Sequence, residues 1–278
     1  MDKISVVIAT KNRKKYVVDL LSDIQNQIKK VDQVVVSDQS DVFEIIENKY
    51  AFELIHFQHL GKGPCCSRNN AVEKATNEIL VFLDDDARID DNFIKEITQP
   101  ILDKKYLVVS GHVNHLNKKS SNKLNENQHW FYKMTSEPKD DADNVCYTPA
   151  GCTAITKKTF WDIGGFNEFF DPNGAGEDRE FSIKIVDKNI KIFYNSKAVL
   201  HHIGAESGGR RDSGKSALEF KKNVGYIIYK YFSKQKFIGY RFFLIKKRLR
   251  NILKFKMPLH NFQMLIIELK NTNPNIYK

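Results

Sequence analysis

The chain has 278 residues, of which 41% are hydrophobic and 28% charged, and this ordinary usage excludes a disordered or fibrous protein and indicates one main domain with a smaller appendage. The formal net charge of +10 is unevenly distributed, because residues 221–278 contain fourteen Lys or Arg and one acid, Glu268. A mildly acidic first part and a basic tail predict two separate roles, with the tail facing phosphate groups.

The first part of the chain alternates short apolar runs with helical patterns, which is typical of βαβ units and a largely parallel sheet. The spacing of Val17, Leu20, Leu21 and Ile24 predicts a helix directly after the first strand. Strands are predicted at residues 4–10, 34–37, 54–57, 79–83 and 106–111, and helices at residues 17–28, 67–75 and 91–102. The sequence therefore predicts an α/β fold with helices flanking a central sheet.

The second half is less regular. Residues 117–144 are polar and lack a period apart from the aromatic residues around Trp130, so we expect a long surface connection that shapes an acceptor site. Helices are predicted at residues 156–166 and 177–188, strands at residues 191–194 and 198–202, and further helical structure at residues 216–270. We expect a catalytic domain over residues 1–215 and a basic, aromatic-rich helical region over residues 216–278.

The chain carries no pattern typical of secretion or of a membrane span. Its start has a short apolar run followed by charge, and no stretch reaches the roughly 20 apolar residues that cross a bilayer. The four cysteines have no CxxC spacing, and Cys65 and Cys66 are adjacent, which disfavours a disulfide framework. We therefore expect reduced thiols in a cytoplasmic protein.

Polar residues follow three of the predicted strands, at the edge where an open parallel sheet binds ligands. Asn12 and Arg13 come after the first strand, Asp38 after the second, and three consecutive carboxylates, residues 84–86, after the strand at 79–83. Adjacent carboxylates repel one another unless a cation neutralises them, and Mg²⁺ or Mn²⁺ would complete its shell with phosphate oxygens and water. The alternative is a solvated acidic turn that caps the helix beginning near Asp91.

A diphosphate would need cationic partners other than the common glycine-rich loops. The chain has neither GxGxxG after the first strand nor GxxxxGK[ST], so the usual dinucleotide and P-loop sites are disfavoured. Lys11, Arg13, Lys62 and Arg68 are the candidates to bind phosphate together with a metal ion.

Six separated strings carry a resemblance: SVVIATKNR, VVVSD, GKGPCCSRNNAV, VFLDDDARID, IGGFNEFF and GAGEDREF. In this order, over roughly residues 3–205, they resemble glycosyltransferase family 2, whose members are inverting enzymes that use nucleotide-diphosphate sugars. The resemblance implies a GT-A fold, which is Rossmann-like. The absence of a QxxRW string, which is expected of processive synthases, favours the addition of a single sugar.

The resemblance also implies roles for matching positions. Asp178 matches the catalytic base, Asp86 matches a metal ligand, and Glu177 and Trp130 would lie on the acceptor side. His202 would complete the shell of the cation, although His201 remains an alternative. The residues that would bind the donor are Thr10, Asn12, Arg13, Asp38, Lys62, Arg68, Asp84 and Asp85, with Asp38 accepting a hydrogen bond from the ring N–H of the base.

The implied activity is transfer of one sugar from a UDP donor, or a dTDP or GDP donor, to a hydroxyl of a glycan or lipid-linked acceptor in cell-surface polysaccharide biosynthesis. The basic tail, with its interleaved Tyr, Phe and Ile, is predicted to attach peripherally to an anionic membrane, or else to be a packed helical unit with a solvated face. Two other functions remain open: a nucleotidyltransferase, and a nucleic-acid-binding protein without enzymatic activity.

Overall fold

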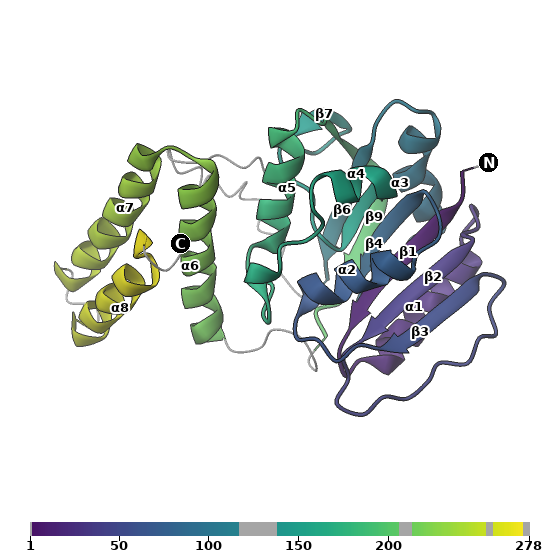
Figure 1. The fold of residues 1–278 in the computed structure, drawn as a ribbon, viewed down its shortest axis with the longest axis horizontal. Coiled ribbons are helices and arrows are strands. Elements are labelled where there is room, and N and C mark those ends of the chain that lie inside the picture. The colour runs from purple at the N-terminus through teal and green to yellow at the C-terminus, as the bar shows by residue number, and fades with distance from the viewer. Residues whose placement is uncertain (1, 117–137, 206–212, 254–257, 275–278) are drawn as a thin grey trace. The chain divides into compact units, whose positions relative to one another are not determined.

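The computed structural model describes residues 2–116, 138–205, 213–253 and 258–274. These residues form two compact units, one up to residue 205 and the other from residue 213 (Figure 1). The expected domain boundary at 215/216 falls within the first turn of helix α6 (Ser213–Tyr231), which belongs whole to the second unit.

The first unit is built on one mixed sheet. Within the described residues the strand order is β3-β2-β1-β4-β8-β6-β9-β5, with β7 pairing against β9. The strands are β1 (Ile4–Thr10), β2 (Gln33–Asp38), β3 (Glu53–Gln58), β4 (Ile79–Asp84), β5 (Ala87–Ile89), β6 (Val108–His115), β7 (Ala142–Val145), β8 (Cys152–Thr156) and β9 (Ile192–His202). The predicted α/β class is confirmed.

Strands β3, β2, β1 and β4 are all parallel, as predicted. Strands β1, β2 and β4 are continuous apolar runs with both faces buried, which is the composition that parallel strands between two helical layers require. The register pairs Thr10 with Asp38 and Ala9 with Asp84. Three strands therefore deliver polar residues to one edge of the sheet.

The rest of the sheet is not parallel throughout, which differs from the expected largely parallel arrangement. Strand β8 runs antiparallel to both β4 and β6, and β5 runs antiparallel to β9. The two strands predicted at residues 191–194 and 198–202 are one strand, β9, whose pairing with β6 shifts register between Gly111 and His112. An irregularity, rather than a turn, separates the two apolar runs.

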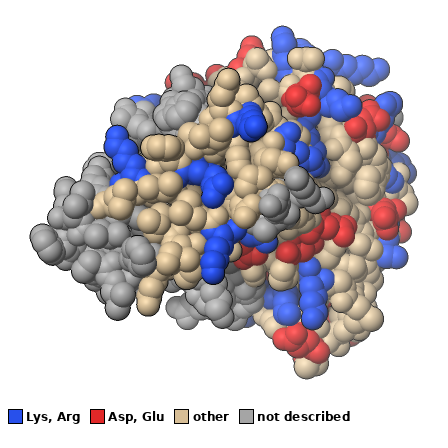
Figure 2. Space-filling view, turned by 60° about the vertical axis from the view of Figure 1, so that its left-hand side comes forward, with Lys and Arg blue, Asp and Glu red and all other residues tan. Residues whose placement is uncertain are grey.

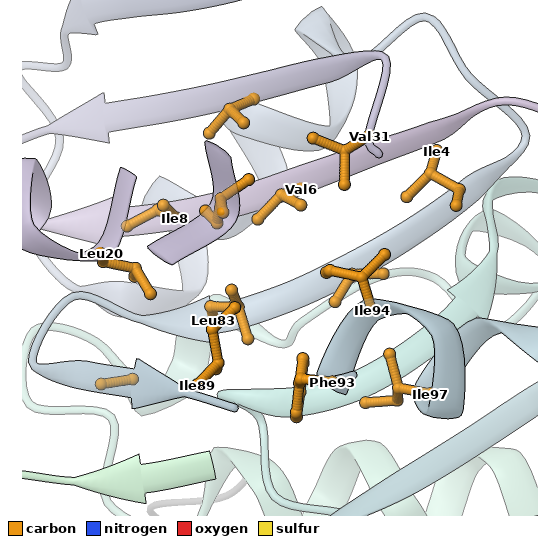
Figure 3. Close-up of a cluster of buried hydrophobic side chains, with 14 of the residues drawn as sticks. Ile4, Val6, Ile8, Leu20, Val31, Leu83, Ile89, Phe93, Ile94 and Ile97 are labelled. Carbon is orange, nitrogen blue, oxygen red and sulfur yellow. The ribbon is translucent and has the colours of Figure 1, made fainter. Parts of the chain in front are cut away.

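Helices cover both faces of the sheet, and the predicted helices are present. Those of the first unit are α1 (Lys14–Asn26), α2 (Pro64–Lys74), α3 (Phe93–Leu102), α4 (Lys157–Asp162), the 3-10 turn η1 (Glu168–Phe170) and α5 (Glu177–Asp187). Leu20 of α1 and Phe93 and Ile97 of α3 pack with Val6 and Ile8 of β1 in the main core (Figure 3). Burial of these side chains is the main stabilising contribution to the first unit.

The second unit consists of α6 and two further helices, α7 (Lys234–Leu253) and α8 (Pro258–Asn271). Its core includes Val224 of α6 and Leu244 of α7. Glu268 of α8 is buried and pairs with Lys221 of α6, so the tail's single acid serves an internal contact. Among the described residues, no helix is long and apolar enough to cross a membrane.

Candidate active site

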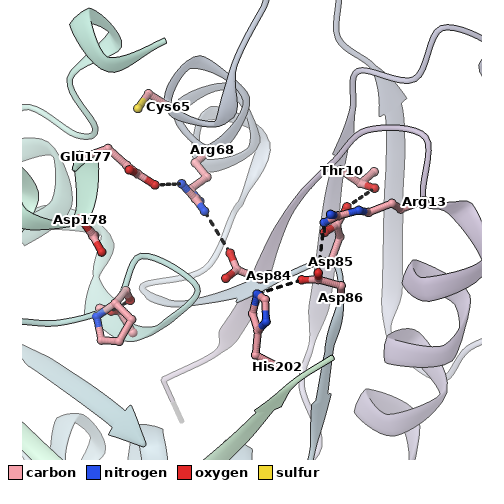
Figure 4. A network of polar contacts seen from close by, with 12 residues as sticks. Thr10, Arg13, Cys65, Arg68, Asp84, Asp85, Asp86, Glu177, Asp178 and His202 are labelled. Atoms are coloured by element: carbon pink, nitrogen blue, oxygen red, sulfur yellow. Dashed lines mark hydrogen bonds and ion pairs between the residues drawn. The ribbon is translucent and has the colours of Figure 1, made fainter. Parts of the chain in front are cut away.

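The carboxylate cluster at the end of β4 divides into three different environments (Figure 4). Asp85 and Asp86 are 5% and 3% exposed, whereas the Asp84 side chain is 34% exposed. The alternative of a solvated acidic turn does not fit this burial. Arg13 Nη1 lies 2.6 Å from Asp85 Oδ1 and 3.4 Å from Asp86 Oδ2, and the other partners of the three acids differ, so the acids are not interchangeable.

Asp85 is held inside the protein by residues from the end of β1. Thr10 Oγ1 donates to Asp85 Oδ2 at 2.8 Å, and Arg13 Nη1 donates to Asp85 Oδ1 at 2.6 Å. Burial raises the pKa of Asp85 to about 6, although Arg13 and Thr10 favour its charged form. Thr10, Arg13 and Asp85 thus brace the turn after β4 against β1, and their polar atoms are directed at one another.

Asp86 faces the end of β9. The backbone N–H of Ala205 donates to Asp86 Oδ2 at 2.9 Å, and His202 Nε2 lies 3.3 Å from Asp86 Oδ1. His201, by contrast, contacts Asp90 Oδ1 through its Nε2 at 2.9 Å. Because successive side chains of a strand point to opposite faces, one of the two histidines is directed at the carboxylate cluster, and that one is His202.

The donor atoms after β4 and at the end of β9 are few but suit a divalent cation. Among the described residues, no group of three or more His, Cys, Asp or Glu side chains is arranged to hold a metal ion by itself. Asp86 and His202 supply a carboxylate oxygen and an imidazole nitrogen that face each other, and Asp84 is exposed nearby (Figure 4). This set fits a cation that takes its remaining ligands from phosphate oxygens and water, as Mg²⁺ and Mn²⁺ do.

Asp84 is the first link in a charged chain that crosses the site. Arg68 Nη2 lies 3.0 Å from Asp84 Oδ1, and Arg68 Nη1 lies 3.4 Å from Glu177 Oε1. The guanidinium also lies over the Phe166 ring, 5.3 Å from its centroid. Arg68 is 8% exposed, so this buried cation connects the end of β4 to the start of α5.

Gly151, which precedes β8, leaves the space that Asp84 occupies. A Cβ atom at Gly151 would lie 2.1 Å from Asp84 Cγ. We expect Gly151→Ala to keep the fold, because the carboxyl end of Asp84 can move, but to turn Asp84 away from Arg68 and lower kcat/KM for the donor by at least about tenfold.

A double-mutant cycle with Asp84→Ala tests this prediction through initial rates. If Gly151 acts through Asp84, Gly151→Ala lowers kcat/KM no further in a protein that already carries Asp84→Ala. Equal losses in both backgrounds would contradict this explanation.

Glu177 and Asp178 form the first turn of α5, where the helix dipole favours acids. Burial and the charge of Asp178 raise the pKa of Glu177, against the opposing effect of Arg68. Asp178 Oδ2 accepts a hydrogen bond from the Tyr147 hydroxyl, and Asp178 Oδ1 accepts from the backbone N–H of Arg179 at 2.8 Å. Burial and the charge of Asp178 raise the pKa of Tyr147 far above its ordinary value, so Tyr147 remains a donor.

Asp38 is buried at the end of β2. His56 Nε2 lies 3.2 Å from Asp38 Oδ2, and the backbone N–H of Ser40 donates to Asp38 Oδ1 at 2.8 Å. Burial raises the pKa of Asp38, but the hydrogen bonds from His56 and Ser40 outweigh burial, and the pKa lies below its ordinary value. Asp38 is therefore an ionised hydrogen-bond acceptor.

The remaining predicted site residues are more peripheral. The Asn12 side chain exchanges hydrogen bonds with Asp41, and Lys62 is exposed on the turn before α2. Trp130 lies outside the described residues. Three residues at the site escaped prediction: Tyr147, Gly151 and His56. Neither a motif nor a period marks them, and their contacts depend on strand pairing.

The family described as Glycosyl transferase family 2 matches residues 5–164. A GalNAc(5)-diNAcBac-PP-undecaprenol beta-1,3-glucosyltransferase of Campylobacter jejuni is 33% identical over 93 residues, which are 31% of this chain and 30% of that protein. A putative polypeptide N-acetylgalactosaminyltransferase 10 of Drosophila melanogaster is 26% identical over 176 residues, which are 58% of this chain and 28% of that protein.

Solved structures of TarS from S. aureus share the fold. TarS 1-349 in complex with UDP-GlcNAc is 20% identical, with a TM-score of 0.62 over 97% of this chain and 72% of that one. TarS 1-349 in a second crystal structure is 19% identical, with a TM-score of 0.59 over 97% and 71%. The matches span less than a third of the length of the two curated relatives. The chain has the GT-A fold that its sequence predicts and belongs to glycosyl transferase family 2.

Proposed function

We propose that this protein is an inverting, metal-dependent glycosyltransferase that moves a single sugar from a nucleotide-diphosphate donor to a hydroxyl of a glycan or lipid-linked acceptor. UDP is the favoured nucleotide, with dTDP and GDP as alternatives, and the setting is cell-surface polysaccharide biosynthesis. The observation that carries the proposal is the chain from Asp84 through Arg68 to Glu177, which ties the carboxylate cluster to the helix of Asp178. The undecaprenol-linked acceptor of the Campylobacter jejuni relative and the UDP-GlcNAc bound to TarS support the acceptor and donor classes.

Each residue then has a defined task. Asp178 takes up the proton of the acceptor hydroxyl while the oxygen of that hydroxyl attacks the anomeric carbon. The hydrogen bond from Tyr147 holds the Asp178 carboxylate in position. Asp86 and His202 would hold Mn²⁺ or Mg²⁺, which when bound stabilises negative charge on the departing diphosphate. Because the leaving group needs no proton, one base suffices, and a single displacement inverts the anomeric configuration.

The test is release of nucleoside diphosphate from a panel of sugar nucleotides with Mn²⁺, Mg²⁺ or EDTA. We expect metal-dependent release from at least one donor, and its loss in Asp86→Ala. Asp103→Ala, which changes an exposed acid at the end of α3, is the matched control. Release of pyrophosphate from nucleoside triphosphates would instead identify a nucleotidyltransferase, and salt-sensitive RNA binding without turnover would identify a nucleic-acid-binding protein.

The proposal includes attachment of the second unit to an anionic membrane. One face of α7 is packed through Phe237 and Leu244, whereas another face exposes Ile238, Phe242 and Leu249 by 51%, 69% and 46%. The spacing of these three residues forms a single stripe, and Lys and Arg flank it along the helix. Figure 2 shows Lys and Arg side chains interspersed with uncharged side chains on the face that it draws.

A stripe of this kind binds through buried apolar area and through attraction of about 1 kcal/mol per cation near the surface. We expect the triple variant Ile238→Ser, Phe242→Ser, Leu249→Ser to lower the fraction that floats with phosphatidylglycerol vesicles by about tenfold. Neutral phosphatidylcholine vesicles should bind neither protein.

The matched control replaces three exposed apolar residues of the first unit: Ile28→Ser, Leu60→Ser and Leu107→Ser. This control should float as the wild type does. Flotation of the α7 variant equal to that of the wild type would instead mean that the second unit is a packed helical unit with a solvated face.

A further inference from the structure

His56 of β3 lies between Asp38 and the segment that joins β2 to β3. Its side chain is 1% exposed. The backbone N–H of Ile46 donates to His56 Nδ1 at 3.0 Å, and His56 Nε2 lies 3.2 Å from Asp38 Oδ2. The Phe43 ring packs against the imidazole with the centroids 4.9 Å apart. His56 therefore joins this connecting segment to the end of β2.

These contacts fix the protonation state of the ring. A backbone N–H is always a donor, so Nδ1 must be the unprotonated nitrogen that accepts from Ile46. The ring proton of the neutral imidazole is then on Nε2, which donates to Asp38. A second proton on Nδ1 would face the Ile46 N–H and break that hydrogen bond. The geometry thus selects the neutral Nε2–H tautomer.

The same contacts determine what Asp38 can recognise. His56 donates to one carboxylate oxygen and Ser40 to the other, so both bonds favour the ionised form and leave acceptor lone pairs only. A ligand group that meets this carboxylate must present a hydrogen-bond donor. Uracil and thymine present a ring N–H at N3, and guanine at N1. Cytosine and adenine present a bare ring nitrogen at that position, which a carboxylate repels, so their neighbouring amino group can donate to Asp38 only if the base shifts in the site.

We infer that His56 is a positioning residue that holds Asp38 as an obligate acceptor and thereby restricts the donor site to nucleoside diphosphates whose base carries a ring N–H. This inference rests on the proposed function, because it takes the edge formed by β1, β2 and β4 as the donor site. Beyond the proposed function, His56 is a new residue of the donor site, and its hydrogen bond explains why the base must carry a ring N–H.

The test compares the affinities of UDP and CDP, measured by calorimetry with Mn²⁺ present. The wild type should prefer UDP by about tenfold to a hundredfold, as expected for one hydrogen bond to a charged group. His56→Phe keeps a ring against Phe43 but removes the donor, and should reduce the preference to within about threefold. His56→Gln restores a hydrogen-bond donor to Asp38 and should recover most of the preference for UDP over CDP.

A purely structural role would lower both affinities by the same factor and leave their ratio unchanged, and that result would overturn the inference. His112→Phe, which replaces a histidine bonded to Tyr194 in the second half of the sheet, should leave the ratio unchanged. If His56→Phe does not fold, the test rests on the ratio of UDP to CDP affinity in the wild type and in His56→Gln. Equal wild-type affinities for UDP and CDP refute the inference.

Nitrogen-15 NMR of the His56 ring supplies an independent readout. A protonated Nε2 with a bare Nδ1 at neutral pH supports the inference, and the opposite tautomer overturns it. If the wild type binds neither UDP, dTDP nor GDP, the proposed function fails together with the inference. If it binds UDP and discriminates against CDP, but His56→Phe discriminates equally well, the inference alone fails.

Discussion

Asp178→Asn is expected to lower kcat by about 10²- to 10⁴-fold, which is the usual contribution of a positioned general base. The amide keeps the size of the side chain and can still accept from Tyr147, but it cannot take up the proton of the acceptor hydroxyl. Donor binding depends on other residues, so the donor KM should change little. Initial rates of nucleoside diphosphate release, measured over a range of donor concentrations, check both parts of this prediction.

Asp187→Asn provides the control, because Asp187 is an exposed acid at the other end of α5. This variant should turn over at nearly the wild-type rate. If Asp178→Asn retained the wild-type kcat with saturating acceptor, Asp178 would not be the base, and the hydrogen bond from Tyr147 would have only a structural role.

Arg13→Met is expected to cause the largest loss of stability, about 3 kcal/mol at pH 8, because it leaves the buried Asp85 carboxylate without its cationic partner. The loss should be smaller at pH 5. The pKa of Asp85 is raised from its ordinary value of 3.8 to about 6, so the wild type loses stability as the pH rises from about 4 to about 6 and no further above that. Without Arg13 the pKa of Asp85 rises further. The free energy of unfolding of the variant therefore continues to fall above pH 6, whereas that of the wild type no longer changes through Asp85.

Urea unfolding at pH 5 and pH 8 measures this difference. The matched control is Arg88→Met, which removes an ion pair between Asp23 and an arginine whose side chain is 48% exposed. Such surface pairs contribute at most about 1 kcal/mol. A loss in Arg13→Met no larger than in Arg88→Met at pH 8 would show that Asp85 does not depend on Arg13.

Strands β1, β2 and β4 were predictable because they are buried on both faces and are therefore rich in consecutive apolar residues. Strand β8 was missed, because its five residues mix Cys, Thr, Ala and Ile without a clear period, and composition does not reveal its antiparallel direction. Strands β5 and β7 were missed since three or four residues are too few to show a period. Strand β9 was divided in two because its irregular stretch interrupts the apolar pattern.

The location of the carboxylate cluster was predictable from its place after a buried strand. The different contacts that its three carboxylates make were not predictable. Asp85 turns inward because Arg13 lies within reach from another strand end, 72 residues away in sequence. His56 lies 18 residues from Asp38, and Tyr147 lies 31 residues from Asp178. No spacing rule connects such pairs, because the strand order and the connecting segments bring them together.

The anomeric configuration of the first product tests the account most directly. Proton NMR of the glycoside formed with the donor that the panel identifies distinguishes the two anomers, which do not interconvert once the glycosidic bond has formed. A single displacement assisted by Asp178 predicts the configuration opposite to that of the donor sugar. A product that retained the donor's configuration would contradict a single displacement and, with it, the role assigned to Asp178.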